Sequence, residues 1–488
     1  MKRTNDLGHD EVFPLVLRLA VPTMLAQLVN VLYSIVDRMY IGAGVGSLAL
    51  AGVGVCAPIV TLLSSFGSLV GMGGSPLMAM RMGEGNKKEA GRILNNGFLM
   101  LLALSIVLTV VFLFSKEYLL MWFGASQATF AYADIYMTIY TAGTFFALMA
   151  GGMNSFLIAQ GFSGLGMATV VLGAVMNIVL DPVFIFIFHM GVAGAAIATV
   201  ISQIASCVFV LLALRSRKMP VRLGWGGFRW KTVRRIAAFG LSPFLIIASD
   251  SILLIVLNTV LQRYGGPGEG DILVTCATIV QSYLLLITMP MGGITLGSQP
   301  VISFNYGRGD AVRIRKALRC IVGLCLGFCA FMMVITYTVS PLYVSLFTKE
   351  GEIAARSVHY IKIFTAMIIP LAVQYPLVDE TTALGQVRLA LFCSAFRKVI
   401  YLGSLLLLPA LFTAEAAFFS EPAADVAAAV MTTCLFLYFF PRVIAKRKAL
   451  MEGPAEKPVE ESMEESAEES AERPAEKLRF KRENSGKI

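Results

Sequence analysis

The sequence contains few charged residues for its length. Of its 488 residues only 15% are charged, whereas 57% are hydrophobic and the mean hydropathy is +0.75. Water-soluble domains are about a quarter charged and at most about half apolar. A single soluble core is therefore excluded, and the excess of apolar side chains is typical of a chain that faces lipid.

Histidine is scarce, and cysteine lacks the spacing of a metal site. His9, His189 and His359 are scattered and form no H-E-x-x-H motif. The eight cysteines lie within or at the ends of apolar stretches without paired C-x-x-C spacing, which indicates reduced packing residues. Paired histidines and a catalytic Ser-Lys motif are also lacking. We therefore expect no cofactor and no enzymatic activity.

Acidic residues are fewer than basic ones, 31 against 40, and the formal net charge is +9. The basic residues lie in short loops between apolar stretches rather than on one polar face, so nucleic acid is not expected as a partner. The polar residues MKRTNDLGHDE run straight into a long apolar stretch without a small-residue cleavage site. No cleaved signal peptide is predicted.

Long apolar stretches dominate the rest of the chain. A helix needs about 20 apolar residues to cross the hydrocarbon core, and twelve stretches meet this length, which predicts an all-α membrane protein. They lie near 13–41, 53–80, 93–114, 133–158, 167–188, 193–214, 236–261, 272–304, 317–339, 358–384, 389–412 and 416–440.

Lys and Arg are unevenly divided between alternate loops. The loops near 81–92, 215–235 and 308–319 are rich in both residues, whereas the opposite loops hold only Lys116, Arg263, Lys349 and Arg356. The positive-inside rule places the basic loops and both termini in the cytoplasm.

The two halves of the chain resemble each other at a nearly fixed offset. Pro76, Gly83 and Gly85 recur 224 residues later as Pro300, Gly307 and Gly309. An offset of six spans preserves orientation, so we expect two parallel six-helix repeats around a central cavity, as in secondary transporters. The predicted parts are a first lobe at 1–218, a cytoplasmic linker at 219–235, a second lobe at 236–445 and a disordered, Glu-rich tail at 446–488.

Acidic residues inside apolar spans suggest an ion site. Asp37 lies near the outer end of the first span, Asn177 and Asp181 lie one turn apart on the fifth, and Thr199 lies in the outer part of the sixth. Hard oxygen ligands of this kind suit sodium, and two close carboxylates could instead hold a proton. Pro182 should weaken the helix at that point. Alternatively, Asp37 pairs with Arg38, and Asp181 only caps a kink.

Other polar residues in the spans are candidates for a substrate cavity. Gln27, Asn30 and Ser34 form one stripe with Asp37, and Asp250 lies near the bilayer midplane, where we expect a cavity-facing carboxylate. Asp379 and Glu380 are expected to pair with Arg388 and Arg397, and Asp425 to make a structural hydrogen bond. The candidate cavity residues are Gln27, Asn30, Ser34, Asp250, Asn258 and Gln281.

Several segments resemble one transporter family. NVLYSIVDRMYIG, MNIVLDPVFIF, GVAGAAIATVISQ, QPVISFNYGRGD and SEPAADV are similar, in order, to segments of the MATE family, multidrug and toxic compound extrusion, nearest its DinF-like and MepA-like bacterial members. The resemblance implies a monomeric antiporter of the bacterial cytoplasmic membrane that exports bulky cationic or amphipathic drugs against Na⁺ or H⁺. It implies the same four cation-site residues, Asp37, Asn177, Asp181 and Thr199. A lipid-linked oligosaccharide flippase of the same superfamily is the alternative, and it would favour an arginine-rich cavity.

Overall fold

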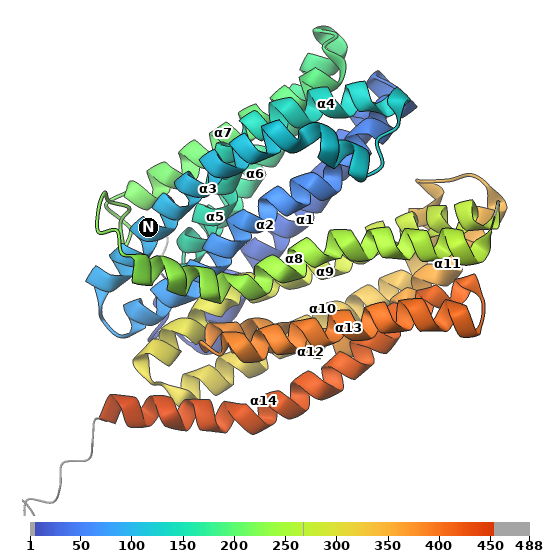
Figure 1. Ribbon diagram of the computed structural model, residues 1–488. Coiled ribbons are helices and arrows are strands. Elements are labelled where there is room, and N and C mark those ends of the chain that lie inside the picture. The colour runs from blue at the N-terminus through green and yellow to red at the C-terminus, as the bar shows by residue number, and fades with distance from the viewer. Residues whose placement is uncertain (1–4, 267, 453–488) are drawn as a thin grey trace, which may run out of the picture. The chain divides into compact units, whose positions relative to one another are not determined.

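The computed structural model describes residues 5–266 and 268–452, and within these ranges every regular element is a helix (Figure 1). The elements are α1 (Val12–Gly44), α2 (Ser47–Gly83), α3 (Lys87–Trp122), α4 (Gln127–Ala142), α5 (Thr144–Ala159), α6 (Ser163–Pro182), the π-helix η1 (Val183–Ile187), α7 (Gly191–Arg215), α8 (Trp230–Gly265), α9 (Glu269–Arg308), α10 (Ala311–Ser345), α11 (Gly351–Phe364), α12 (Ile368–Ala383), α13 (Val387–Leu411), the 3-10 helix η2 (Ala414–Phe419) and α14 (Ser420–Glu452).

The predicted all-α membrane fold is confirmed. Ten helical segments in the described residues are long and apolar enough to cross a membrane, and the number rises to twelve when two bent pairs each count as one span. The pairs are α4 with α5, bent by 57°, and α11 with α12, bent by 51°. These breaks fall in the fourth and tenth predicted spans, which the hydropathy pattern predicted to be continuous.

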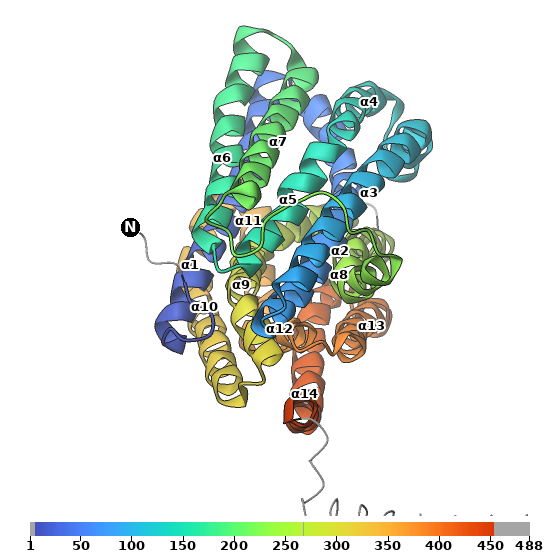
Figure 2. The ribbon, with the colours of Figure 1, turned by 90° about the vertical axis from the view of Figure 1, so that its left-hand side faces the viewer.

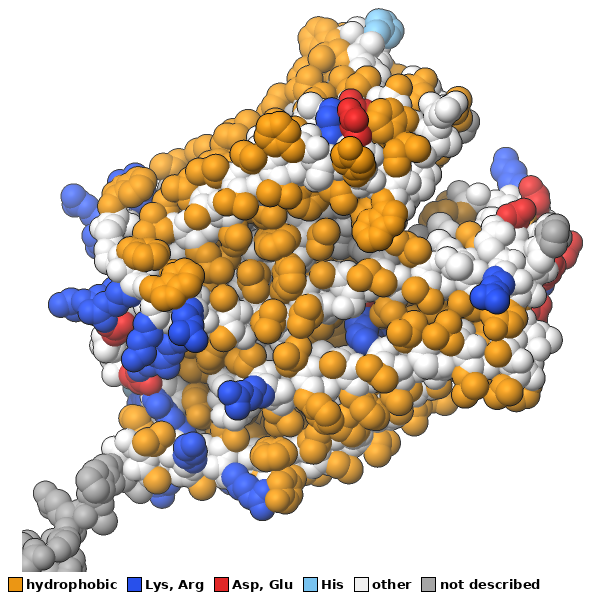
Figure 3. Space-filling view, in the orientation of Figure 1, with side chains coloured by type: hydrophobic (Ala, Val, Ile, Leu, Met, Phe, Trp, Pro, Cys, Tyr) orange, Lys and Arg blue, Asp and Glu red, His pale blue; other side chains and the backbone are white. Residues whose placement is uncertain are grey.

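Two hydrophobic clusters fill the interior of the compact unit Met1–Tyr438. One is built from residues between Ile41 and Ile236, and the other, apart from Ala20, from residues between Leu257 and Ala424. In Figures 1 and 2, α1 to α7 gather on one side of this unit, and α9, α10, α12 and α13 on the other. Apolar side chains cover much of the face shown in Figure 3. Large apolar side chains such as Phe114 are exposed, as expected of a surface that faces lipid.

The two halves meet where α1 packs along α9 and α2 packs along α8 and α9. Gly240 of α8 lies so close to α2 that an added Cβ would be 1.7 Å from the carbonyl oxygen of Leu69. At Gly307 of α9 an added Cβ would be 2.0 Å from the carbonyl oxygen of Met80, and Gly83 is packed equally closely against Phe304. We call Gly83, Gly240 and Gly307 the glycine seam. At the glycine seam the two halves are in direct contact, near the end of the protein that carries the basic loops.

Residues Asn5–Asp10, the N-terminal strap, cross this same end. Asn5 donates to the carbonyl of Gly161 at the end of α5 (2.8 Å). From the other half, Asn305 donates to the Leu7 carbonyl (2.9 Å) and Arg308 to the Gly8 carbonyl (2.9 Å). The strap therefore ties the first half to the second.

The stretch between α7 and α8 is held by the first half. Arg229 donates its backbone N–H to Asn96 (2.9 Å), and Val221 donates to Gln160 (2.9 Å). At the other end of the chain α14 continues to Glu452, seven residues beyond the domain boundary predicted after 445. Most of the predicted tail, 453–488, lies outside the described residues.

Candidate functional site

Helices α6 and α7 bring three of the four predicted cation-site residues together. Asn177 and Asp181 are one turn apart on α6, and the Asn177 amide donates to Asp181 Oδ1 at 3.2 Å. The same amide is 3.3 Å from the hydroxyl of Thr199 on α7, and that hydroxyl donates to the carbonyl of Ala195 at 3.0 Å. Asn177 and Asp181 are buried, while Thr199 is half-buried.

The fourth residue, Asp37 of α1, is half-buried and lies beside Asp181, so that the two carboxyl groups interact. Asp37 Oδ1, Asn177 Oδ1 and Asp181 Oδ2 are buried and accept no hydrogen bond from the residues that the structure describes. Buried acceptors without a donor are costly, and two adjacent carboxylates repel each other unless a cation or a shared proton lies between them. The geometry therefore presents three oxygens, on two helices, to a positively charged ligand.

The backbone at Asp181 departs from an ordinary helix. α6 ends at Pro182 and is followed by the π-helix Val183–Ile187, in which the N–H of Phe188 donates to the Val183 carbonyl at 3.0 Å. Proline has no N–H to offer Ile178, so the helix is open to rearrangement directly beside Asp181. This is the weakened point that the sequence predicted.

Tyrosines adjoin the acid pair, and the sequence analysis did not single them out. Tyr33 of α1 and Tyr136 of α4 interact electrostatically with Asp37. Tyr140 is stacked on Tyr136, with ring centroids 6.1 Å apart, and lies beside Gln203 of α7. In the sequence these tyrosines look like ordinary core residues on two distant helices, α1 and α4. Only the fold shows that they lie near the acid pair.

The candidate cavity residues of the first span stay on one stripe. Gln27, Asn30 and Ser34 are half-buried, and Ser34 donates to the carbonyl of Asn30 at 3.0 Å. In the second half Asn258 and Gln281 are also half-buried, and Asn258 Oδ1 accepts no hydrogen bond. That these five line a substrate cavity stays a prediction.

That Asp250 faces a substrate cavity stays a prediction, and the structure adds a partner that the sequence did not indicate. Its side chain is 55% exposed, but it forms an ion pair with Lys398 of α13. Asp250 is thus not a free carboxylate waiting for a cationic drug, because a lysine on the neighbouring helix already balances its charge.

The expected salt bridges of Asp379 and Glu380 are also wrong. Asp379 accepts from the Thr295 hydroxyl at 2.6 Å and borders a cavity of about 10 Å³, room for about one water molecule. Glu380 is fully buried, and among the described residues neither of its carboxyl oxygens has a hydrogen-bond partner. Arg397 points elsewhere and pairs with Glu421 and with Asp425 at 2.8 Å. The hydrogen bond expected at Asp425 is therefore present, with a charged donor.

The fold is that of a polytopic membrane protein, and this cluster of polar side chains is its candidate ion-binding centre. Within the described residues no group of three or more His, Cys, Asp and Glu side chains comes together to hold a metal. The centre instead combines two acids with an amide and a hydroxyl.

Known proteins specify the family. The MatE family model matches residues 22–183 and 247–404, and the chain belongs to this family of multidrug efflux transporters. The chain is 22% identical to the multidrug export protein MepA of Staphylococcus saprophyticus over 444 residues, 91% of this chain and 97% of the relative. The MepA protein of Staphylococcus aureus strain N315 is 22% identical over 446 residues, with the same coverage.

Solved structures share the fold. One is described as the outward-facing conformation of a multidrug resistance MATE family transporter of the MOP superfamily; the TM-score is 0.85 at 22% identity, over 92% of this chain and 100% of that one. A MOP superfamily transporter from Pyrococcus furiosus, described as having a binding pocket of reverse polarity, gives the same values.

Proposed function

We propose that the protein is a cation-coupled antiporter that exports bulky amphipathic or cationic compounds across the bacterial cytoplasmic membrane. The observation that carries the proposal is the set of three buried oxygens without donors, on Asp37, Asn177 and Asp181. A site with two acidic side chains loses electrostatic repulsion when it binds Na⁺ or H⁺. Binding one of these ions therefore supplies energy that an antiporter can use.

The structure supports an outward-facing state for this antiporter. The glycine seam and the N-terminal strap close the end with the basic loops, which the positive-inside rule assigns to the cytoplasm. Figure 3 shows the unit hollowed at the opposite end, between the region of α4 and the region of α11. In this state the ion site would load from outside, and drug would leave there.

The flippase alternative fits the site less well. A carrier of lipid-linked pyrophosphate would favour basic residues around its cavity. The centre described here has two acids, and the nearby arginine of α1, Arg38, is exposed.

The test is transport in vesicles with Na⁺ and pH gradients imposed separately. Asp37→Asn and Asp181→Asn should each abolish ion-driven drug export, because each removes one charge with little change in volume. Asp271→Asn, at an exposed acid bonded to Gln262 at 2.7 Å, is the matched control and should export normally. Normal export by both site variants at wild-type membrane levels would refute the assignment. The gradient that drives wild-type export identifies the ion.

A further inference from the structure

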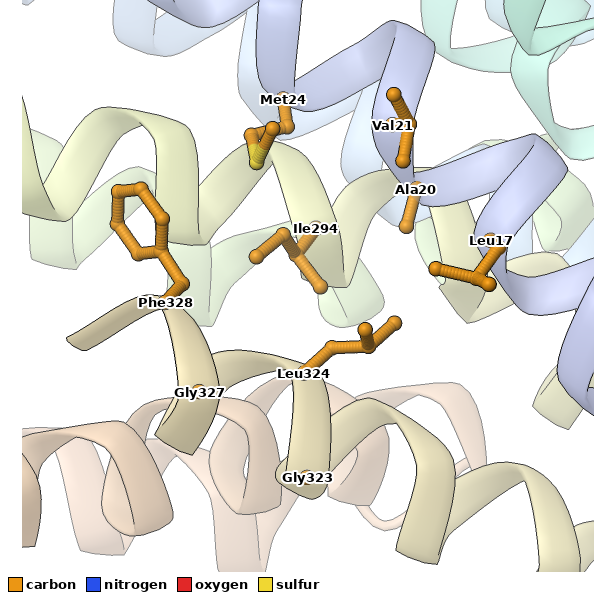
Figure 4. Close-up of a pocket in the computed structure, with 9 residues that line it drawn as sticks. All are labelled: Leu17, Ala20, Val21, Met24, Ile294, Gly323, Leu324, Gly327 and Phe328. Atoms are coloured by element: carbon orange, nitrogen blue, oxygen red, sulfur yellow. The ribbon is translucent and has the colours of Figure 1, made fainter. Parts of the chain in front are cut away.

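An apolar groove runs between the two halves on the flank of the protein. It has a volume of about 260 Å³. α1 contributes one wall, and α9 and α10 contribute the other, as Figure 4 shows. Its lining is Leu17, Ala20, Val21, Met24, Ile294, Gly323, Leu324, Gly327 and Phe328.

The groove opens to the surface rather than to the ion site. Val21 is 40% exposed, and Gly323 and Gly327 are exposed as well. The two glycines lie one turn apart on α10, and a Cβ added at either would meet no atom within 4 Å. Every lining side chain is apolar, so the groove offers no hydrogen bond to a polar ligand. In a membrane-spanning segment such a surface is filled by hydrocarbon.

Three basic residues of α10 precede the two groove glycines along the helix. Arg315, Lys316 and Arg319 are exposed, and within the described residues none of them forms an ion pair. Lys316 is seven residues before Gly323, and therefore on the same helix face. Arg319 is four residues before Gly323, a rise of about 6 Å. An anion bound here would lie at the mouth of the groove, at the level of lipid headgroups.

We propose that this groove binds one anionic glycerophospholipid of the leaflet next to the basic loops, which is the cytoplasmic leaflet in the orientation proposed above. One acyl chain fills the space beside Gly323 and Gly327, and the phosphate is held by Lys316 and Arg319. Charge complementarity selects this occupant, because basic residues at the cytoplasmic ends of membrane helices attract anionic headgroups. The proposal does not depend on the identity of the coupling ion or of the drug.

The position of the groove gives the lipid a role in transport. Its walls come from α1 in the first half and from α9 and α10 in the second, so a bound chain contacts both halves at once. A ligand that fits only one arrangement of two moving parts shifts the population towards that arrangement. The lipid should therefore favour the state in which the glycine seam is closed.

Filling the groove tests the acyl-chain site. Gly323→Leu and Gly327→Leu place side chains in open space, so neither should disturb packing. Gly403→Leu on α13 also enters open space, at an exposed position outside the groove, and is the matched control. Purified variants would be titrated with phosphatidylglycerol in phosphatidylcholine nanodiscs, with bound lipid counted by native mass spectrometry. The groove variants should lose the tight phosphatidylglycerol site, and Gly403→Leu should keep it.

Removing charge tests the headgroup site. Lys316→Gln and Arg319→Gln should each weaken phosphatidylglycerol binding about fivefold, because one basic residue contributes about 1 kcal/mol at an anionic surface. Arg234→Gln, at an exposed basic residue of α8, should change it little. Wild-type phosphatidylglycerol affinity in both groove variants would overturn the proposal. So would equal effects of groove filling on drug export with and without phosphatidylglycerol, because drug would then be the occupant.

Discussion

At the scale of single residues, the buried ionisable side chains of the described residues divide into those with a partner and those without. Arg397 has two acidic partners, Glu421 and Asp425, and its guanidinium is mostly buried. Glu380 has none. A buried charge is tolerated when its partner is present and is strongly destabilising when the partner is removed. Arg397 is therefore a structural centre of the second half.

Arg397→Met should lower the free energy of unfolding by about 3–5 kcal/mol, because it leaves Glu421 and Asp425 without a counter-charge. Arg397→Lys should recover only part of this, since lysine cannot span both acids with a planar group. Thermal unfolding in detergent measures the effect, with the exposed Arg388→Met as control. Equal stability of Arg397→Met and Arg388→Met would contradict this role.

Asp250 and Lys398 should behave as one unit. Asp250→Asn alone leaves Lys398 unpaired within the membrane region, which costs stability. Adding Lys398→Gln removes the remaining charge, so the double variant should be more stable than either single variant. A double-mutant cycle on membrane yield and melting temperature measures the coupling. Strictly additive losses would show that the pair does not interact.

The side-chain contacts around Asp181 were easier to predict from the sequence than the contacts of the second half. Acids inside apolar spans are rare, so Asp37 and Asp181 were identifiable by residue type. The one-turn spacing of Asn177 and Asp181 correctly predicted that these two side chains are neighbours. Arg397 lies eighteen residues from Asp379 along the chain and was matched with the wrong acids. Sequence spacing fixes neighbours on one helix, but which helices touch depends on packing.

At the scale of elements, the two halves fit together through backbone-to-backbone contacts between helices at glycine residues. Gly240→Ala should break the contact of α8 with α2, because the added methyl would overlap the Leu69 carbonyl and backbone cannot move aside as a side chain can. We expect a shift away from the closed seam and slower export. Spin-label distances across the two halves measure the shift. Gly403→Ala should leave them unchanged, and the same distances in Gly240→Ala as in the wild type would contradict the prediction.

Twelve spans could be predicted because hydropathy depends only on composition. The breaks within two of these spans could not be predicted. The first break lies at Gly143, where an added Cβ would be 2.6 Å from Val200 of α7. That close approach is a tertiary contact and leaves no periodic trace in the sequence. The second break, between Phe364 and Ile368, falls in an equally apolar stretch.

At the scale of the whole molecule, the last described helix sets where the chain can be shortened. Truncation after Glu452 removes the low-complexity Glu, Ser and Ala segment and the basic residues LRFKRENSGKI that follow it, which together have little apolar content to bury. Export and membrane level should both stay at the wild-type value in a drug-resistance assay with quantitative blotting. Loss of export at a normal membrane level would instead give the tail a regulatory role.

The glycine seam also has a consequence for the protein when it is in the membrane but not transporting drug. A bacterium draws on its ion gradient for many kinds of uptake, and a carrier with a loose inner end would let that gradient leak away. At Gly240 and Gly307 backbone lies against backbone with no space for a methyl group, and hence none for water. In the proposed orientation, copies without drug would insulate the membrane, so the cell could keep the protein in place before a toxic compound arrives.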